Sequence, residues 1–169
     1  MSRKLRMYFF VPYNISEIQK GIQAGHAALQ YANYYDNMPE YQEFIKHHKT
    51  WIILNGGTTR ERETKDGIGT LNQLAHDLAC NRIPFASFYE PDLNDALTAL
   101  CFLCDDRVFD FENFPMFRNW LFGARSNFDE FSDDELKSEY KDSYSVWCEL
   151  VGGRENVFLK ELIFDKKLA

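Results

Sequence analysis

Hydrophobic and polar positions along the first 104 residues follow a pattern typical of an α/β domain. Residues 4–11 form a nearly continuous apolar run with aromatic side chains, which predicts a buried strand. Three later runs have the same character and predict strands at residues 49–55, 84–90 and 97–104. Two segments with helical periodicity separate the first three strands, at residues 16–35 and 70–81. The predicted order is therefore β-α-β-α-β-β.

The connections between these elements predict how the strands are arranged. Helical crossovers make the first three strands parallel, whereas the short connection at residues 91–96 returns the fourth strand antiparallel. We therefore expect an α/β fold with a mixed four-stranded sheet and helices on both of its faces.

Beyond residue 104 the pattern becomes rich in aromatic residues and mainly helical. The segment "SDDELKSEY" has the composition of an acidic helix start, and "NVFLKELIFDKKLA" is amphipathic. So many Phe, Trp and Tyr side chains need burial. We therefore expect residues 1–104 to form one α/β domain and residues 105–169 to form a C-terminal extension packed on it.

The ends and faces of the two predicted helices carry further signals. Ser16 with Gln19, and Thr70 with Gln73, have the spacing of a capping box. In the first helix, one set of large apolar residues recurs on a single side and is expected to face the core: Ile15, Ile18, Ile22 and Leu29.

A second, polar line of side chains runs along the first helix. Gln19, Gln23, His26 and Gln30 are spaced by four, three and four residues, which places them on one narrow strip. Glutamine is a good former of surface helices, and a single histidine beside a core is commonly structural. An ordinary helix surface therefore remains an alternative to a functional site.

The position of this helix in the predicted fold favours a site. In sheets with parallel strands, ligands bind where the carboxyl ends of strands meet the amino ends of helices. Lys20 lies in the first turns of the helix, and Asp92 lies in the acidic connection after the third strand. Thr98 follows at the start of the fourth strand. The predicted site therefore has Lys20, Gln23 and His26 facing Asp92 and Thr98.

The charge is distributed unevenly along the chain. The net charge is -7, of which residues 1–104 carry -1 and residues 105–169 carry -6. An acidic surface does not favour the phosphate contacts that drive most nucleic-acid binding. Any RNA contact is therefore expected in the first part of the chain.

Composition and cysteine usage predict the compartment. No apolar run approaches the length needed to cross a bilayer, and the basic start of the chain has no small-residue cleavage site. The four cysteines are scattered through apolar segments, as expected of reduced, buried thiols. We therefore expect a cytoplasmic protein without membrane contact.

The segment "QAGHAALQYA" resembles the Q-x-x-H-A-A motif on the first helix of the second, archaeal and eukaryotic class of peptidyl-tRNA hydrolases. Gln23 and His26 match the motif in place. Asp92 is similar to the aspartate of the family's D-x-G-x-T turn, and Thr98 to the threonine that opens its last core strand. The resemblance covers residues 5–104. It implies cleavage of the ester between a peptide and the 3' ribose of tRNA, without metal or cofactor.

The chain also departs from the family pattern. Gln19 stands where the family has a lysine, and Lys20 follows one residue later. The acidic turn is shorter than the family's, and Asn94 stands in place of its glycine. The resemblance implies catalytic roles for His26, Asp92 and Thr98, and substrate contacts for Lys20, Gln23, Gln19 and Asn94.

A second hypothesis follows from these departures. The chain is then a binding module that keeps the hydrolase-like fold without the reaction and recognises RNA, or a protein partner through its acidic extension. A viral effector that mimics nucleic acid by its negative charge is a further reading of the same acidity.

Overall fold

The computed structural model describes residues 3–59, 69–123 and 131–169. The chain divides into two compact units. The first contains Met1–Cys104 together with Asp165–Ala169, and the second contains Asp105–Phe164. The second unit is therefore inserted in sequence between the sheet and the last five residues.

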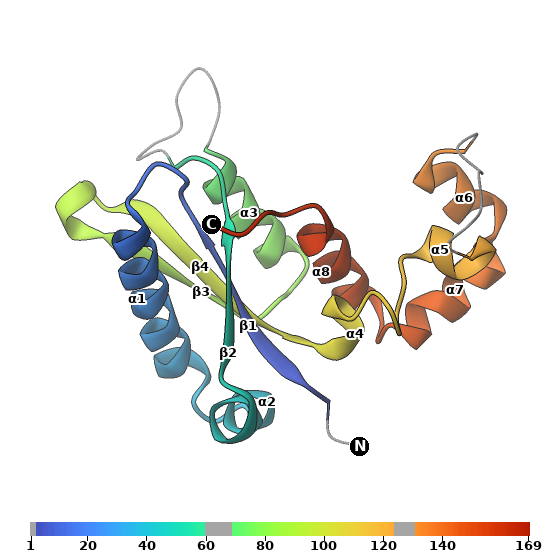
Figure 1. Cartoon of the computed structure of the whole chain (residues 1–169), viewed down its shortest axis with the longest axis horizontal. Coiled ribbons are helices and arrows are strands. Elements are labelled where there is room, and N and C mark those ends of the chain that lie inside the picture. The colour runs from blue at the N-terminus through green and yellow to red at the C-terminus, as the bar shows by residue number, and fades with distance from the viewer. Residues whose placement is uncertain (1–2, 60–68, 124–130) are drawn as a thin grey trace. The chain divides into compact units, whose positions relative to one another are not determined.

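The first unit is built on a four-stranded sheet with the order β2-β1-β4-β3 (Figure 1). The central strand β1 pairs in parallel with β2, and β4 pairs with β3 in the antiparallel sense. The predicted mixed α/β sheet is thus confirmed. The strands are β1 (Leu5–Val11), β2 (Thr50–Asn55), β3 (Phe85–Glu90) and β4 (Ala96–Asp105).

Helices cover both faces of this sheet, as predicted. The helix α1 (Glu17–Tyr35) packs on the face that carries Met7 and Phe9. On the opposite face, the rings of Phe10 and Phe102 lie 5.8 Å apart, and α3 (Thr70–Cys80) contributes three buried leucines. Since successive side chains of a strand point to opposite faces of the sheet, one apolar strand contributes side chains to the hydrophobic core on each face.

The orientation of α1 differs from the prediction. Ile18, Ile22 and Leu29 are 78%, 50% and 71% exposed, so the expected core stripe faces outward. The buried face carries Ala24, Ala27 and Tyr31, with Lys20 and Gln23 at its start. Small alanines let the helix approach a sheet face already filled by large side chains. Periodicity alone did not distinguish the two apolar sides.

The two predicted capping boxes had different outcomes. Ser16 caps α1 as predicted, because its hydroxyl accepts from the Gln19 amide and the Gln19 side chain accepts from the Ser16 amide. The second prediction was wrong, since Gly69 is the N-cap of α3. The Thr70 hydroxyl instead donates to the Gly56 carbonyl at 3.1 Å, tying the helix start to the loop after β2.

A short helical segment lies between α1 and β2. It consists of α2 (Pro39–Glu43) and a π-helical turn (Phe44–His48), which ends at Lys49 with a φ of 58°. Tyr41 and Phe44 are buried in the core beneath α1.

The last residues of the chain return to the sheet. The Asn55 amide donates to the Lys167 carbonyl at 3.0 Å, and the Ala169 amide donates to the Ile53 carbonyl at 3.0 Å. Leu168 forms an antiparallel bridge with Leu54. The tail, which was expected in the extension, therefore covers the outer edge of β2.

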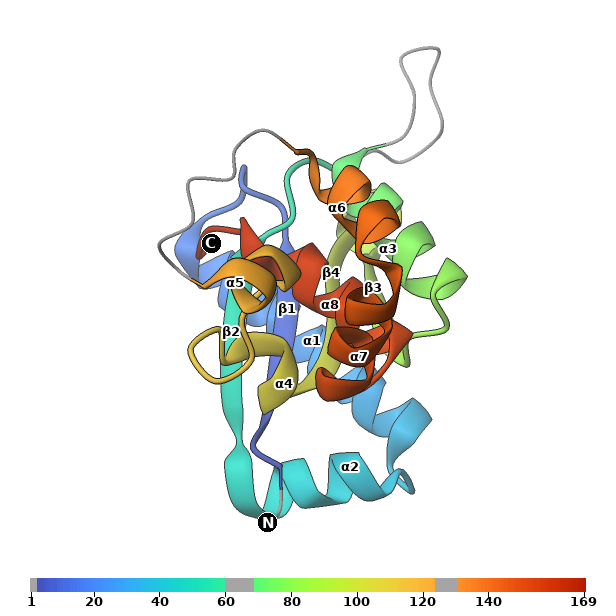
Figure 2. The same cartoon turned by 90° about the vertical axis from the view of Figure 1, so that its right-hand side faces the viewer.

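The second unit is helical and has its own aromatic core. Trp147 is almost fully buried beside Phe117 and Tyr144, and its indole N–H donates to the Pro115 carbonyl at 3.0 Å. Its helices are α4 (Asp106–Phe109), α5 (Phe117–Phe122), α6 (Asp133–Glu139), α7 (Lys141–Leu150) and α8 (Arg154–Phe164) (Figure 2).

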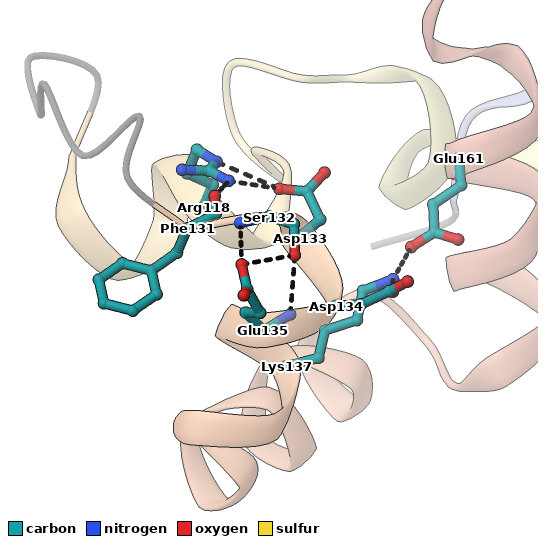
Figure 3. A network of polar contacts seen from close by, with 8 residues as sticks. All are labelled: Arg118, Phe131, Ser132, Asp133, Asp134, Glu135, Lys137 and Glu161. Atoms are coloured by element: carbon teal, nitrogen blue, oxygen red, sulfur yellow. Dashed lines mark hydrogen bonds and ion pairs between the residues drawn. The ribbon is translucent and has the colours of Figure 1, made fainter.

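Polar contacts link three helices of the second unit (Figure 3). Arg118 of α5 pairs with Asp133 of α6 at 2.9 Å. Lys137 of α6 pairs with Glu161 of α8 at 2.8 Å. Because these groups are partly exposed, we assign them to orientation of the helices more than to stability.

Lys160 is the fully buried cation of the second unit's described residues. Its ammonium group donates to the Arg107 and Val108 carbonyls at 3.1 and 3.2 Å and lies 4.2 Å from the Phe111 ring centroid. Burial lowers the pKa of Lys160 to about 8, although nearby Asp110 and Asp105 oppose the shift.

We expect the second unit to become more stable between pH 8 and pH 10. In this range the folded lysine has lost its proton and the unfolded one retains it, so stability rises with pH. The gain is about 2–3 kcal/mol, since one pKa unit corresponds to about 1.4 kcal/mol. Above pH 10 the trend reverses, because burial raises the pKa of Tyr144 to about 12. Hydrogen exchange of residues 131–164 followed by mass spectrometry measures the change.

The Lys160→Met variant tests the origin of this effect. It should flatten the rise between pH 8 and pH 10, whereas Lys141→Met, at an exposed site, should leave it intact. An unchanged rise in the Lys160→Met protein would assign the effect to another group.

No helix within the described residues combines the length and the apolar composition needed to cross a membrane. All four cysteines lie outside any disulfide, as predicted. The predicted burial is correct for Cys101 and Cys104, but Cys80 is exposed at the end of α3 and Cys148 is half-buried.

Candidate functional site

The polar strip of α1 lies along strand β3. Gln23 bonds to Glu90 at the end of β3, and His26 stacks on Phe88. Further along, Gln30 lines a groove beside the same strand. Gln19, the remaining residue of the strip, instead belongs to the capping box at the start of α1. The regular spacing of these residues thus reflects contact with one edge of the sheet.

A chain of short hydrogen bonds forms the centre of the candidate site. The Thr98 hydroxyl donates to the Gln23 carbonyl oxygen at 2.6 Å, and the Gln23 amide nitrogen donates to Glu90 at 2.6 Å. Thr98 and Gln23 are buried, whereas Glu90 is half-buried. The buried amide is satisfied at both ends, and it holds the carboxylate at the end of β3.

A β-bulge explains why Thr98 reaches Gln23. The partners of β3 shift by one residue, from Phe88 opposite Ala99 to Tyr89 opposite Leu97, so Thr98 is passed over. Simple alternation would turn Thr98 away from Ala99, which packs beneath α1. The extra residue re-aims the threonine toward the helix.

We expect Thr98→Val to destabilise the first unit by about 1–3 kcal/mol, because the buried Gln23 oxygen loses its donor without a change in side-chain volume. The loss of stability is measured by urea unfolding, with hydrogen exchange of residues 5–59 as the readout. Thr50→Val, at an exposed position at the start of β2, is the matched control and should have little effect. Equal stability of the two variants would contradict the assigned role of the hydroxyl.

His26 is exposed, and its ring lies nearly parallel to that of Phe88, with centroids 4.4 Å apart and an interplanar angle of 17°. The described residues provide no hydrogen-bond partner for its nitrogens. The imidazole is therefore held by stacking while its nitrogens face solvent. Such an imidazole is available to exchange a proton with a bound molecule.

The other predicted site residues lie outside this hydrogen-bonded centre. Lys20 is buried on the inner side of α1, and its ammonium group pairs with Glu17 at 2.8 Å. Asp92 is exposed in the 3₁₀ turn Pro91–Leu93, and Asn94 follows with a φ of 53°. The structure thus joins Thr98 to Gln23 and places His26 one turn further along α1.

Glu90 is the site residue that the sequence analysis did not select. Asp92 was chosen instead from the acidic connection after the third strand. The alternation of side chains along β3 could have indicated Glu90. Phe88 and Glu90 lie two positions apart and therefore share the face that packs against α1.

A groove of about 510 Å³ runs beside β3. Its walls come from α1 and from β3 itself: Gln30, Tyr34, Phe85, Ser87, Phe88 and Tyr89. A second, mostly apolar groove of about 410 Å³ lies near the opposite edge, with Tyr41, Phe44 and Trp51 in its wall. Neither groove is lined by Lys20 or Asp92, and His26 reaches the first only through Phe88.

These groups provide the elements of acid–base chemistry. The Glu90 carboxylate is fixed through Gln23, and the His26 imidazole is open to solvent. A carboxylate and an imidazole can accept and return a proton during hydrolysis. Within the described residues, no cluster of three or more His, Cys, Asp and Glu side chains is arranged to hold a metal ion.

The chain matches no protein-family model, and no curated protein matches it either.

Proposed function

We propose that this chain is an ester hydrolase of the peptidyl-tRNA type, with Gln23, His26, Glu90 and Thr98 at its site. The observation that carries the proposal is the hydrogen-bonded chain from Thr98 through Gln23 to Glu90. It joins the Q-x-x-H-A-A helix to the strand end and the threonine that the family resemblance singles out.

In the proposed reaction, water attacks the ester carbonyl carbon and the bond to the 3' oxygen of the ribose breaks. His26 takes the proton of the attacking water and returns it to the departing ribose oxygen. Glu90 orients the water or the imidazole, and Asp92 is the second candidate carboxylate. Gln23 positions these groups, and Thr98 fixes the Gln23 amide, so the threonine acts through its neighbour rather than as an oxyanion donor.

The direct test is release of a labelled peptide from purified peptidyl-tRNA by the full-length protein. We expect a rate well above that of buffer. A rate equal to buffer, with the fold confirmed by circular dichroism, would rule out the reaction.

The carboxylate that takes part in the reaction is identified by comparing two carboxylate variants. Glu90→Gln keeps the shape of the side chain and should lower kcat strongly, whereas Asp92→Asn should have a small effect. Asp95→Asn, in the same turn, is the control for Asp92→Asn. The opposite ranking would assign the role to Asp92.

A binding module without catalysis is the second candidate. The pairing of Lys20 with Glu17 favours it, because this cation is already engaged and buried. Retention of tRNA on the full-length protein in a filter-binding assay, without cleavage of peptidyl-tRNA, would support this reading. In that case we expect a protein partner to bind the acidic second unit, which carries most of the negative charge.

A further inference from the structure

The groove beside β3 follows an open edge of the sheet. β3 is the terminal strand of the order β2-β1-β4-β3, and α1 packs along it (Figure 1). The lining includes Ser87 and Tyr89 from one face of β3, and Phe88 from the other. A groove lined from both faces of a strand runs along the strand's edge, with α1 as its second wall.

The backbone of β3 offers hydrogen-bonding groups to this groove. The Phe88 carbonyl points toward β4, since it accepts from the Thr98 hydroxyl at 3.4 Å. The Phe85 carbonyl points the other way and accepts from the Tyr35 hydroxyl at 3.1 Å. Because these directions alternate along an antiparallel strand, the N–H and C=O of Ser87 face the open edge.

The chemistry of the lining indicates the class of ligand. All six lining side chains are uncharged, and two of them, Tyr34 and Tyr89, are more than half exposed. A phosphate backbone needs Lys or Arg contacts, which this lining does not supply. Backbone amides beside aromatic and amide side chains instead suit an extended peptide, which binds by adding a strand to an exposed edge.

The chain itself uses the same mode of pairing at the other edge of the sheet. The Asn55 amide donates to Lys167, and the Ala169 amide donates to Ile53, so the tail covers β2. An extended segment therefore already occupies one edge of this sheet, while β3 has no strand partner on its outer side among the described residues.

We propose that this groove, here named the β3 groove, holds the peptide part of a peptidyl-tRNA as an extended strand paired with β3. This inference rests on the proposed function. The ester end lies at Glu90 and Gln23, and the peptide runs past Phe88 and Ser87 toward Phe85. The main-chain hydrogen bonds that supply the affinity in this mode do not depend on the side chains of the peptide, so we expect the site to accept many peptide sequences.

The experiment compares two substrates on the full-length protein. One tRNA carries a single N-acetylated valine, and the other carries a longer N-acetylated chain of alternating valine and threonine, which favours the extended state. We expect a KM about tenfold lower for the longer substrate with similar kcat, because backbone hydrogen bonds add affinity without taking part in the reaction. Equal KM values would overturn the inference and leave the proposed function standing.

Ser87→Pro removes the amide that faces the groove at a position where an edge strand tolerates proline. It should raise the KM of the longer substrate to that of the shorter one, whereas Ser87→Ala, which keeps the amide, should not. Tyr34→Ala changes the opposite wall without altering the strand and should also reduce the preference for length. Retention of the full preference in both Ser87→Pro and Tyr34→Ala would overturn the inference.

Fluorescence anisotropy with the labelled Val/Thr peptide, free of tRNA, separates this inference from the proposed function. If neither tRNA substrate is cleaved, the proposed function fails, and peptide binding sensitive to Ser87→Pro would still support the β3 groove. Absence of peptide binding would then overturn it. A third outcome would also overturn the inference: a short single-stranded RNA binds, Tyr34→Ala weakens this binding, and Ser87→Pro does not. The groove would then be a nucleic-acid site.

Discussion

Replacing His26 with alanine is expected to lower kcat for peptidyl-tRNA by about 10²–10⁴-fold, the contribution typical of a positioned general base. The imidazole is stacked on Phe88, which lines the β3 groove, and its nitrogens face solvent. In the proposed reaction, removing it takes away the group that accepts the proton of the attacking water. Single-turnover cleavage of labelled peptidyl-tRNA measures the chemical step directly.

Two further variants show whether the loss is chemical. His26→Phe keeps a stacking ring without nitrogens and should be as slow as His26→Ala. His47→Ala removes an exposed histidine of the same unit and should retain full activity. If His26→Phe were as active as the unaltered protein, the ring would act only as a packing element.

Replacing Trp147 with alanine is expected to destabilise the second unit by about 3–5 kcal/mol, the usual cost of removing a large buried aromatic side chain. The indole is almost fully buried against Phe117 and Tyr144, and its N–H satisfies the Pro115 carbonyl. A loss of this size is a large part of the stability of a small unit. Hydrogen exchange of residues 131–164 should therefore approach that of an unfolded chain.

The same experiment reports on the first unit. Residues 5–59 belong to a separate core and should keep their protection in the Trp147→Ala protein. Val146→Ala, at the adjacent exposed position, is the matched control and should leave both units unchanged. Loss of protection in both units together would show that they unfold as one cooperative body.

The strands and long helices were predictable because hydrophobic periodicity reports directly on burial. Continuous apolar runs marked the strands, and short connections fixed the antiparallel return of β4. The inner face of α1 was not predictable in the same way, because Ile18 and Leu29 are more hydrophobic than the buried Ala24 and Ala27. Which apolar side of α1 faces the core depends on the space that the sheet leaves for it. The sequence of the helix alone does not contain this information.

The candidate site was predictable in part, for a related reason. Gln23 and His26 were found from their spacing, and Thr98 from its position at the start of β4. The contact of Thr98 with Gln23 depends on a bulge, which inserts one residue into the register and leaves no local sign in the apolar run. Glu90 was passed over because an acidic turn contains several carboxylates, and only the paired strands show which one faces α1.

The return of the tail to β2 has a consequence for the order of folding. Leu54 and Leu168 pair across more than a hundred positions of sequence, with the whole second unit between them. Contacts between such distant segments form late, because the loop that joins them must first be closed. We therefore expect the β2 edge to stay open until late in folding. Intermolecular strand pairing, and hence aggregation, is then most to be expected at this edge in a folding intermediate.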